Sequence, residues 1–310
     1  MDHERPFRPA RVAALLALVL LAACSSSGQR QDDSAAPRTA TAAPTATGPA
    51  PTTRAAVPGA ARPTPSPSAA ATNGPAAHAR WHPRAGTPWQ WQLSGTVDTT
   101  VDVPVYDIDG FENSAAVVRR LHAAGRKVIC YVNAGAWESF RPDAKAFPAA
   151  LMGKGDGWNG ERWLDIRAVG RLRPLMAARF DMCRSKGFDA VEPDLLDGYT
   201  NTTGFPLTAA DQLAYNRMIA TLAHERGLAV GLKNDLDQVA PLVGDFDFSV
   251  DEQCAQYDEC PSLTPFIAAG KPVFHVEYEL KAGQFCAATR RLGFSSMVKH
   301  LSLDAWRQPC

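Results

Sequence analysis

Eight short apolar runs alternate with stretches of helical pattern, and this alternation constrains the fold of the chain more than any other feature. The runs span residues 89–93, 103–106, 127–132, 190–192, 228–232, 246–250, 272–276 and 295–299. Runs that are apolar on both faces and alternate with helices indicate a parallel sheet. Eight such strands in about 230 residues predict an α/β fold, a single (β/α)8 TIM-like barrel.

The helical stretches support this interpretation. They are predicted at residues 114–124, 172–186, 209–226 and 282–292, and they are followed by Gly125, Gly187, Gly227 and Gly293, as is common in αβ loops. The stretch from Ser94 to Asp102 is too short for a full helix, so we expect a degenerate first βα unit. A doubly wound open sheet is the alternative, but no Gly-x-Gly-x-x-Gly sequence follows the first strand.

The amino terminus predicts export. Arg5, Arg8 and Arg11 precede an apolar run at residues 12–23 that is too short to span a membrane comfortably. The run ends in Leu-Ala-Ala-Cys24, which resembles the lipobox of bacterial lipoproteins. Residues 1–23 are therefore predicted to be a signal peptide and Cys24 to be lipidated. The alternative is an ordinary secretory signal, in which case Cys24 has no special role and the protein is secreted.

Residues 24–80 are predicted to be a disordered tether. From Ser25 to Arg80 the chain consists mainly of Ala, Pro, Thr and Ser, and it lacks Phe, Trp, Tyr, Leu and Ile. Such a segment cannot bury enough apolar area to offset the entropy of ordering it. Residues 81–310 hold all seven tryptophans and should form one domain. Acidic and basic residues are equal in number, 32 of each, so nothing indicates a nucleic-acid partner.

The cysteines predict disulfide bonds. Six remain beside Cys24, and an even number in an exported domain favours pairing over free thiols. Fifteen pairings are possible for six cysteines. Local spacing suggests Cys254–Cys260 and Cys286–Cys310, which leaves Cys130–Cys183. A zinc site is the competing interpretation, but the chain has no Cys-x-x-Cys pair and few histidines.

Carboxylates gather where two of the predicted strands end. Glu192, Asp194 and Asp197 follow one strand, and Asp251 and Glu252 follow another. Carboxylates are costly to bury unless they are paired, hydrogen-bonded or used. In a barrel the carboxyl ends of the strands carry the chemistry. These acids therefore predict acid–base or nucleophilic catalysis, most simply glycoside hydrolysis.

Eight short motifs are spread over roughly residues 85 to 300. They are Trp89-Gln90-Trp91-Gln92-Leu93-Ser94-Gly95, Tyr106-Asp107-Ile108-Asp109, Cys130-Tyr131-Val132-Asn133-Ala134-Gly135, Trp163-Leu164-Asp165-Ile166-Arg167, Glu192-Pro193-Asp194, Asp197-Gly198-Tyr199, Leu232-Lys233-Asn234 and Glu252-Gln253-Cys254. In sequence and in order they resemble glycoside hydrolase family 114, the endo-α-1,4-polygalactosaminidases. The resemblance implies a barrel that cleaves partly deacetylated galactosamine polymers.

The same resemblance implies that Asp194 and Glu252 are the catalytic pair, with Asp194 as nucleophile or base and Glu252 as acid. Glu192 is the main competitor of Asp194. Asp194 could instead cap the following segment, and Glu252 could be a surface ion-pair partner. Many relatives have Asn after Pro-Asp, whereas this chain has Leu195, so an orienting side chain could be missing.

Other strand-end residues are expected to bind or orient the substrate. The candidates are Asp107, Asp109, Tyr131, Asn133, Glu192, Asp197, Tyr199, Lys233 and Tyr278. Lys233 is expected to keep one carboxylate ionised, although a solvated lysine at the barrel rim is the alternative. His275 lies within an apolar run and is expected to be an interior histidine rather than a ligand.

The sequence thus predicts a lipid-anchored, extracytoplasmic glycosidase that acts as a monomer on a polysaccharide, with no metal and no cofactor. An excess of carboxylates would suit a polycationic galactosamine substrate. Two alternatives stay open. One is a surface lipoprotein that binds glycan without cleaving it, and the other is a hydrolase of a different glycan.

Overall fold

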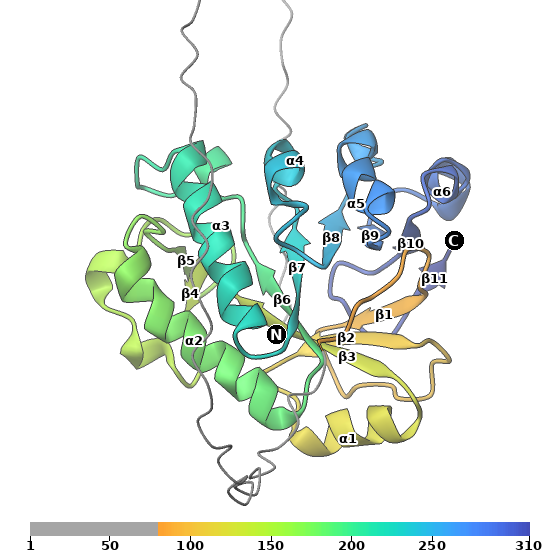
Figure 1. The fold of residues 1–310 in the computed structure, drawn as a ribbon, viewed down its shortest axis with the longest axis horizontal. Helices are drawn as coiled ribbons and strands as arrows, with labels where there is room; N and C mark the ends of the chain where they lie inside the picture. Colours follow the sequence, from red (N-terminus) through yellow and green to blue (C-terminus); the bar gives the residue numbers. More distant parts are fainter. Residues whose placement is uncertain (1–79) are drawn as a thin grey trace, which may run out of the picture. The chain divides into compact units, whose positions relative to one another are not determined.

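Eight parallel strands form one curled sheet in this computed structural model, which describes residues 80–310 (Figure 1). The sheet order is β1-β2-β3-β6-β7-β8-β9-β10-β11, and only β11 runs antiparallel to its neighbour. The strands are β1 Trp89–Gln92, β2 Val105–Asp109, β3 Lys127–Asn133, β6 Ala190–Asp194, β7 Ala229–Lys233, β8 Phe248–Glu252, β9 Val273–Glu277, β10 Ser295–Val298 and β11 Gln308–Pro309.

Helices connect these strands and lie along the outer side of the sheet (Figure 1). They are α1 Ala115–Ala123, α2 Val169–Lys186, α3 Ala209–His224, α4 Val239–Leu242, α5 Thr264–Ala268 and α6 Ala282–Arg291. Short 3₁₀ turns occur at η1 Ala144–Ala146, η2 Ala149–Leu151, η3 Gly198–Thr200, η4 Leu236–Gln238 and η5 Cys260–Leu263. Gly187 ends α2 with a φ of 94°, a conformation that residues with a side chain rarely adopt.

The predicted barrel is confirmed. Each of the eight predicted apolar runs overlaps one of the parallel strands, and parallel strands that follow one another in sequence are neighbours in the sheet. The degenerate first unit is also confirmed, because residues 93–104 contain no helix. Several strands extend further than predicted, so that Asp109, Asp194, Lys233 and Glu252 are the last residues of strands and Asp107 lies within β2, rather than in loops.

Two separate cores follow from side chains that alternate between the faces of each strand. The inner core lies on the concave face of the sheet and includes Trp89, Val105, Ala190 and Phe248. The outer core packs the other face against the helices, with residues such as Val191, Leu232 and Phe180. Toward the carboxyl ends of the strands, the side chains that point to the concave face are polar instead of apolar. The alternation of side chains along each strand therefore places these polar groups together on the concave face.

One element was not predicted. After β3 the chain forms a hairpin of β4 Ala136–Glu138 and β5 Glu161–Trp163 before it enters α2. These three-residue strands are too short to leave a period-two pattern in the sequence. The hairpin adds side chains beside the carboxyl end of β3, because Asn133 Nδ2 donates to Glu161 Oε2 at 3.2 Å.

The carboxy-terminal segment joins the two ends of the parallel sheet. Trp89 of β1 donates to the Ser295 carbonyl of β10, and Arg307 donates back to the Trp89 carbonyl, each at 2.9 Å. A disulfide between Cys286 and Cys310 fixes the chain end to α6. All three suggested pairings, Cys130–Cys183, Cys254–Cys260 and Cys286–Cys310, are present. Such bonds persist in oxidising, extracytoplasmic compartments.

The predicted signal peptide, Cys24 and residues 25–79 of the predicted tether lie outside the described residues, so these assignments stay predictions. The search for a possible membrane span covered residues 80–310. None of the helices there combines the length and the apolar character that a membrane crossing requires.

Candidate active site

A buried lysine lies at the centre of the polar side chains at the carboxyl end of the barrel. Lys233 Nζ is 2.8 Å from Asp194 Oδ1, 3.0 Å from Glu252 Oε2 and 3.3 Å from Glu192 Oε1. Its side chain is fully buried and packs over the Trp91 ring, 5.0 Å from the ring centroid. The neighbouring carboxylates raise the pKa of Lys233 although burial alone would lower it, so the site holds a permanent cation.

Strand geometry brings these residues together from three parts of the sequence. Asp194, Lys233 and Glu252 are the last residues of the consecutive strands β6, β7 and β8. Ala190, Ala229 and Val250 are the inner-core residues of these strands. Asp194 and Lys233 lie four residues beyond theirs, and Glu252 lies two residues beyond Val250. Because side chains alternate with a period of two, all three point to the concave face. The sequence therefore predicted these positions, and the sheet order makes them neighbours.

The backbone just past each of these three strands is strained. Leu195, Asn234 and Gln253 have φ values of 61°, 49° and 67°. Residues with side chains cost free energy in this left-handed region, and such residues cluster at functional sites. Gly135 allows the turn at Leu195, because a Cβ atom there would lie 1.9 Å from the Leu195 carbonyl oxygen. Strain at all three strand ends supports a functional role for this edge.

Hydrogen bonds hold the two candidate catalytic carboxylates in place. Tyr131 donates to Asp194 Oδ2 at 2.7 Å, and the Leu195 backbone N–H donates to Asp194 Oδ1 at 2.8 Å. Tyr278 donates its hydroxyl hydrogen to Glu252 Oε1. The Leu195 amide thus orients Asp194 through the backbone. The positive φ of residue 195 also explains why Asn, which tolerates this conformation better than Leu, would suit the position.

Asp107 and Glu192 form a second, deeper pair below the lysine. Both are fully buried, and each carboxyl interacts with the other through a side-chain hydrogen bond. Apart from the ion pair between Glu192 and Lys233, neither carboxyl group contacts a hydrogen-bond donor from a backbone amide or a hydroxyl group in the described part of the chain. Two buried carboxylates that lie this close repel each other's charge, which favours a proton on the pair. Burial raises the pKa of Asp107 well above 3.8 and also raises that of Glu192, while Lys233 opposes the rise at Glu192.

The raised pKa of Asp107 predicts how stability depends on pH. A carboxyl whose pKa rises on folding destabilises the folded state increasingly as pH climbs above the unfolded value, 3.8 for Asp107. Asp107→Asn removes this ionisation but can still donate to Glu192. We expect the variant to match the wild type in free energy of unfolding at pH 4 and to exceed it at pH 8, as measured by urea denaturation.

The matched control is Asp109→Asn two residues away, which removes a carboxylate that is paired with an arginine. That variant should be less stable than the wild type at pH 8. A wild type that is more stable than Asp107→Asn at pH 8 would show that Asp107 is ionised.

Asp109 and Asn133 take part in structural contacts. Arg141 binds both oxygens of Asp109, at 3.1 and 2.7 Å, and the Phe111 and Glu112 amides also donate to it. Asn133 Oδ1 accepts from Gly135 N and Ala136 N, which fixes the entry to the hairpin. These contacts favour a positioning role over the sugar-binding role expected from the sequence.

The remaining predicted residues lie nearby in the fold. Asp197 is buried at the end of the segment that follows β6, and its carbonyl accepts from Asn201 and from the hydroxyl of Thr200. Tyr199 is half-buried within η3. Lys233, expected at the rim or beside a carboxylate, is buried and bound to three carboxylates, so the rim alternative is wrong.

The sequence analysis missed two acids on the hairpin side. Glu161 begins β5 and Asp156 precedes it, and their carboxyl groups share a hydrogen bond. Burial, followed by the charge of Asp156, raises the pKa of Glu161 to about 9, and the charge of Asp194 contributes to this rise. Glu161 is therefore protonated at neutral pH. Only prediction of the hairpin could have revealed these residues, because neither follows a barrel strand.

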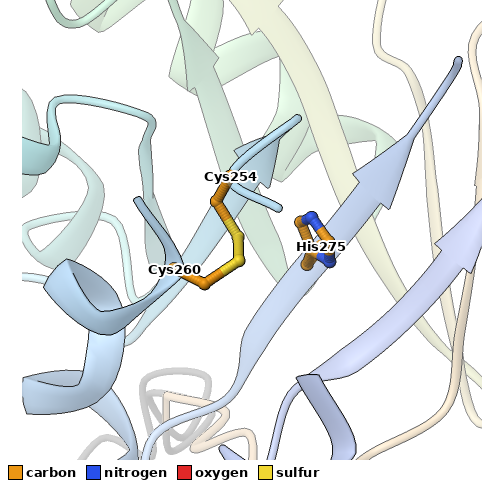
Figure 2. A group of neighbouring side chains, drawn as sticks. All are labelled: Cys254, Cys260 and His275. Atoms are coloured by element: carbon orange, nitrogen blue, oxygen red, sulfur yellow. A yellow bond between two sulfur atoms is a disulfide. The ribbon is translucent and has the colours of Figure 1, made fainter. Parts of the chain in front are cut away.

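A disulfide anchors the loop that follows Glu252. Cys254 and Cys260 are bonded at 2.02 Å, and His275 of β9 lies beside them (Figure 2). Ligand atoms of these three residues lie within 4.8 Å of one another, the spacing of a metal site. Both sulfurs are engaged in the disulfide, so in this oxidised form they provide no thiolate ligand. The His275 ring contacts Ser296 and Glu277 and is fully buried, as an interior histidine should be.

Comparison with known proteins gives concordant matches. The chain matches the model of glycoside hydrolase family GH114 over residues 70–310. It is 40% identical to Aspergillus fumigatus Ega3, whose crystal structure is a complex with galactosamine; the match covers 76% of this chain and 100% of Ega3, with a TM-score of 0.71.

Two further relatives are more distant. The glycoside hydrolase domain of PelA from Pseudomonas aeruginosa is 16% identical with a TM-score of 0.55, over 71% of this chain and 96% of that domain, which is a likeness of fold alone. An uncharacterised protein of Deinococcus radiodurans is 26% identical over 94% of this chain and 96% of its own length.

Proposed function

Because the chain belongs to glycoside hydrolase family GH114, we propose that it cleaves α-1,4-linked galactosamine-containing polysaccharide with Asp194 and Glu252 as its catalytic pair. One observation carries the assignment of the pair. Both carboxylates contact the buried ammonium of Lys233 from adjacent parts of the sheet, and each also accepts a tyrosine hydroxyl. Glycosidases need two carboxyl groups that are held rigidly on either side of the scissile bond.

The spacing of the pair favours retention of configuration at the anomeric carbon. Asp194 Oδ1 and Glu252 Oε2 are 2.8 and 3.0 Å from one nitrogen, so they are at most about 6 Å apart. Retaining enzymes hold their carboxyl groups about 5–5.5 Å apart, whereas inverting enzymes need about 6.5–9.5 Å to admit a water molecule. The shorter spacing leaves room for direct attack by Asp194.

The proposed reaction has two steps. Asp194 attacks the anomeric carbon while the Glu252 carboxyl gives its proton to the glycosidic oxygen, and the bond between that oxygen and the anomeric carbon breaks. Glu252 then takes a proton from water, whose oxygen displaces Asp194 and releases the second product. Lys233 positions both carboxyl groups, and its positive charge favours the ionised form of Asp194, the nucleophile.

The substrate class rests on two kinds of support. Ega3, which is 40% identical, was crystallised in complex with galactosamine. In addition, the site is rich in carboxyl groups. Glu192, Asp194 and Glu252 contact Lys233 directly. The charge of Lys233 acts on Asp107, and the charge of Asp194 acts on Asp156. Such an acidic environment favours the ammonium groups of a deacetylated amino sugar over a neutral sugar.

Incubation of the full-length protein with a partly deacetylated α-1,4-galactosamine polymer tests the proposal. We expect new reducing ends to accumulate, and proton NMR during the first turnovers should show the α anomer before mutarotation. A β product would overturn the retaining mechanism. Binding without cleavage would instead favour the non-catalytic glycan-binding alternative, and cleavage of other glycans alone would favour the hydrolase of a different polymer.

The cellular arrangement is a separate proposal. We infer that the catalytic domain acts outside the cytoplasm as a monomer, linked by residues 24–80 to a lipid on Cys24. The three disulfides support the compartment, and the lipobox-like sequence supports the anchor. Fatty-acid labelling of the intact protein tests the anchor, and absence of the label would leave a secreted enzyme.

A further inference from the structure

We propose that Trp306 is a rigid stacking platform that binds a galactosamine unit of the polymer a short distance from the catalytic pair. The inference rests on the proposed function, and it adds a binding subsite on the loop between β10 and β11. It is drawn from the exposure of the ring, from the way its loop is held, and from its place at the carboxyl edge of the sheet.

The Trp306 ring is unusually exposed for its size. It is 42% exposed, and among the described residues only Phe140 is another large hydrophobic side chain that is exposed. His300 stacks on it with ring centroids 4.2 Å apart and an interplanar angle of 10°, so one face is covered. The part of the ring that solvent reaches must therefore be its other face and its edges. Phe140 differs, because the Arg141 guanidinium already lies over its ring.

Buried side chains hold the backbone under this ring. Lys299 donates to the carbonyl oxygens of Asp304 and Trp306 at 2.7 and 2.5 Å, and Gln90 donates to that of Ala305 at 2.8 Å. Lys299 and Gln90 are themselves 1% and 0% exposed. The carbonyl groups of residues 304, 305 and 306 are thus all bound by buried side chains. An exposed aromatic ring on a loop fixed in this way loses little conformational entropy when a ligand binds.

The carboxylate of Asp304 completes the support. Its Oδ1 accepts the Trp306 backbone N–H at 3.0 Å, and its Oδ2 contacts His300 Nδ1 at 2.9 Å. Asp304 therefore positions both rings of the stack. Its side chain is 43% exposed, so it also places a negative charge beside the platform.

The platform lies on the same edge of the sheet as the catalytic pair. Val298, the last residue of β10, pairs with Glu277 of β9 and with Gln308 of β11, which places Trp306 just beyond the carboxyl end of β10. Strand β8, which ends at Glu252, is two strands away. Two inter-strand spacings amount to about 10 Å. A polysaccharide bound at the catalytic pair can cover this distance with a few sugar units.

The chemistry of the platform selects an amino sugar. The apolar face of a pyranose ring can stack on an indole, and an ammonium group gains further attraction from the electron-rich ring face, for which tryptophan is the best partner. The exposed carboxylate of Asp304 favours the same positive charge. A deacetylated galactosamine unit offers both the ring and the cation.

Kinetics of the full-length protein on partly deacetylated galactosamine polymer test the platform. We expect Trp306→Leu to raise KM about tenfold while kcat stays within about twofold, because the lost attraction acts on binding and not on the bond that breaks. Trp306→Phe keeps an aromatic face and should stay within about threefold of the wild-type KM. A Trp306→Leu variant with KM within twofold of the wild type would overturn the proposal.

A second measurement separates this inference from the proposed function. If the wild type cleaves no galactosamine polymer, the proposed function fails, and calorimetric binding of galactosamine oligosaccharides then tests the platform alone. A Kd about tenfold weaker for Trp306→Leu than for the wild type supports it. An equal Kd, or an equally weakened Kd for Trp306→Phe, overturns it.

Discussion

Asp194→Asn is expected to lower kcat about a thousandfold or more on galactosamine polymer while the protein stays folded. The amide cannot act as a nucleophile or base, and loss of such a group costs about a hundredfold to ten thousandfold or more. The backbone contact from Leu195 N can persist, because an amide oxygen still accepts at that position. Initial rates of reducing-end release measure the loss, and a thermal unfolding curve confirms that the fold is kept.

Glu252→Gln should show a comparable loss, and the two losses should not add, because both groups act in the same step. Glu279→Gln is the matched control. It changes an exposed carboxylate two residues beyond β9 at the same edge of the barrel, and it should keep nearly full activity. If Asp194→Asn retained more than a tenth of the wild-type kcat, then Glu192, the competing acid, would become the better candidate.

Lys233→Met is expected to cause the largest loss of stability, about 3–5 kcal/mol at pH 7. Removing the cation leaves Asp194, Glu252 and Glu192 close together without their shared partner. Since the pKa of Lys233 is raised on folding by ionised carboxylates, its stabilising contribution is fully present at pH 7 and is lost only as pH rises beyond the unfolded value of 10.5 or as the carboxylates are protonated in acid. Urea denaturation at pH 7 measures the difference in the free energy of unfolding.

Two comparisons make this result specific. Lys186→Met removes a half-buried lysine that contacts only carbonyl oxygens, at 2.6 and 3.3 Å, and should cost about 1 kcal/mol. In acid, the Lys233→Met deficit should shrink, because protonated carboxyl groups no longer need a cation. A deficit below about 1 kcal/mol at pH 7 would mean that the carboxyl cluster is already neutral without Lys233.

Much of the fold followed from local patterns. The buried strands, their order and the degenerate first unit were all predicted, because a strand that is apolar on both faces leaves a continuous signal of several residues. The β4–β5 hairpin escaped prediction because three-residue strands leave no such signal. Asp156 and Glu161 were missed for the same reason. Glu161 nevertheless contacts Asn133, and the charge of Asp194 contributes to its raised pKa.

The candidate site was also predicted only in part. Strand ends singled out Asp194, Lys233 and Glu252 as positions for chemistry, but the sequence could not separate the upper pair from the deeper one. Asp107 and Asp109 are both strand-end acids in one motif. In the fold, Asp107 is buried against Glu192, which raises its pKa, whereas Asp109 is bound by Arg141, 32 residues further along the chain.

The sequence by itself determined the strand–helix alternation and the polar strand ends, since each depends on neighbouring residues, and the export signals stay predictions from sequence. Tertiary structure alone decided which charges meet. Lys233 lies 39 residues from Asp194 in the chain, yet their side chains are 2.8 Å apart. The physical reason is that burial makes every unpaired charge costly, so the role of an acid depends on the partner that the closed sheet brings to it.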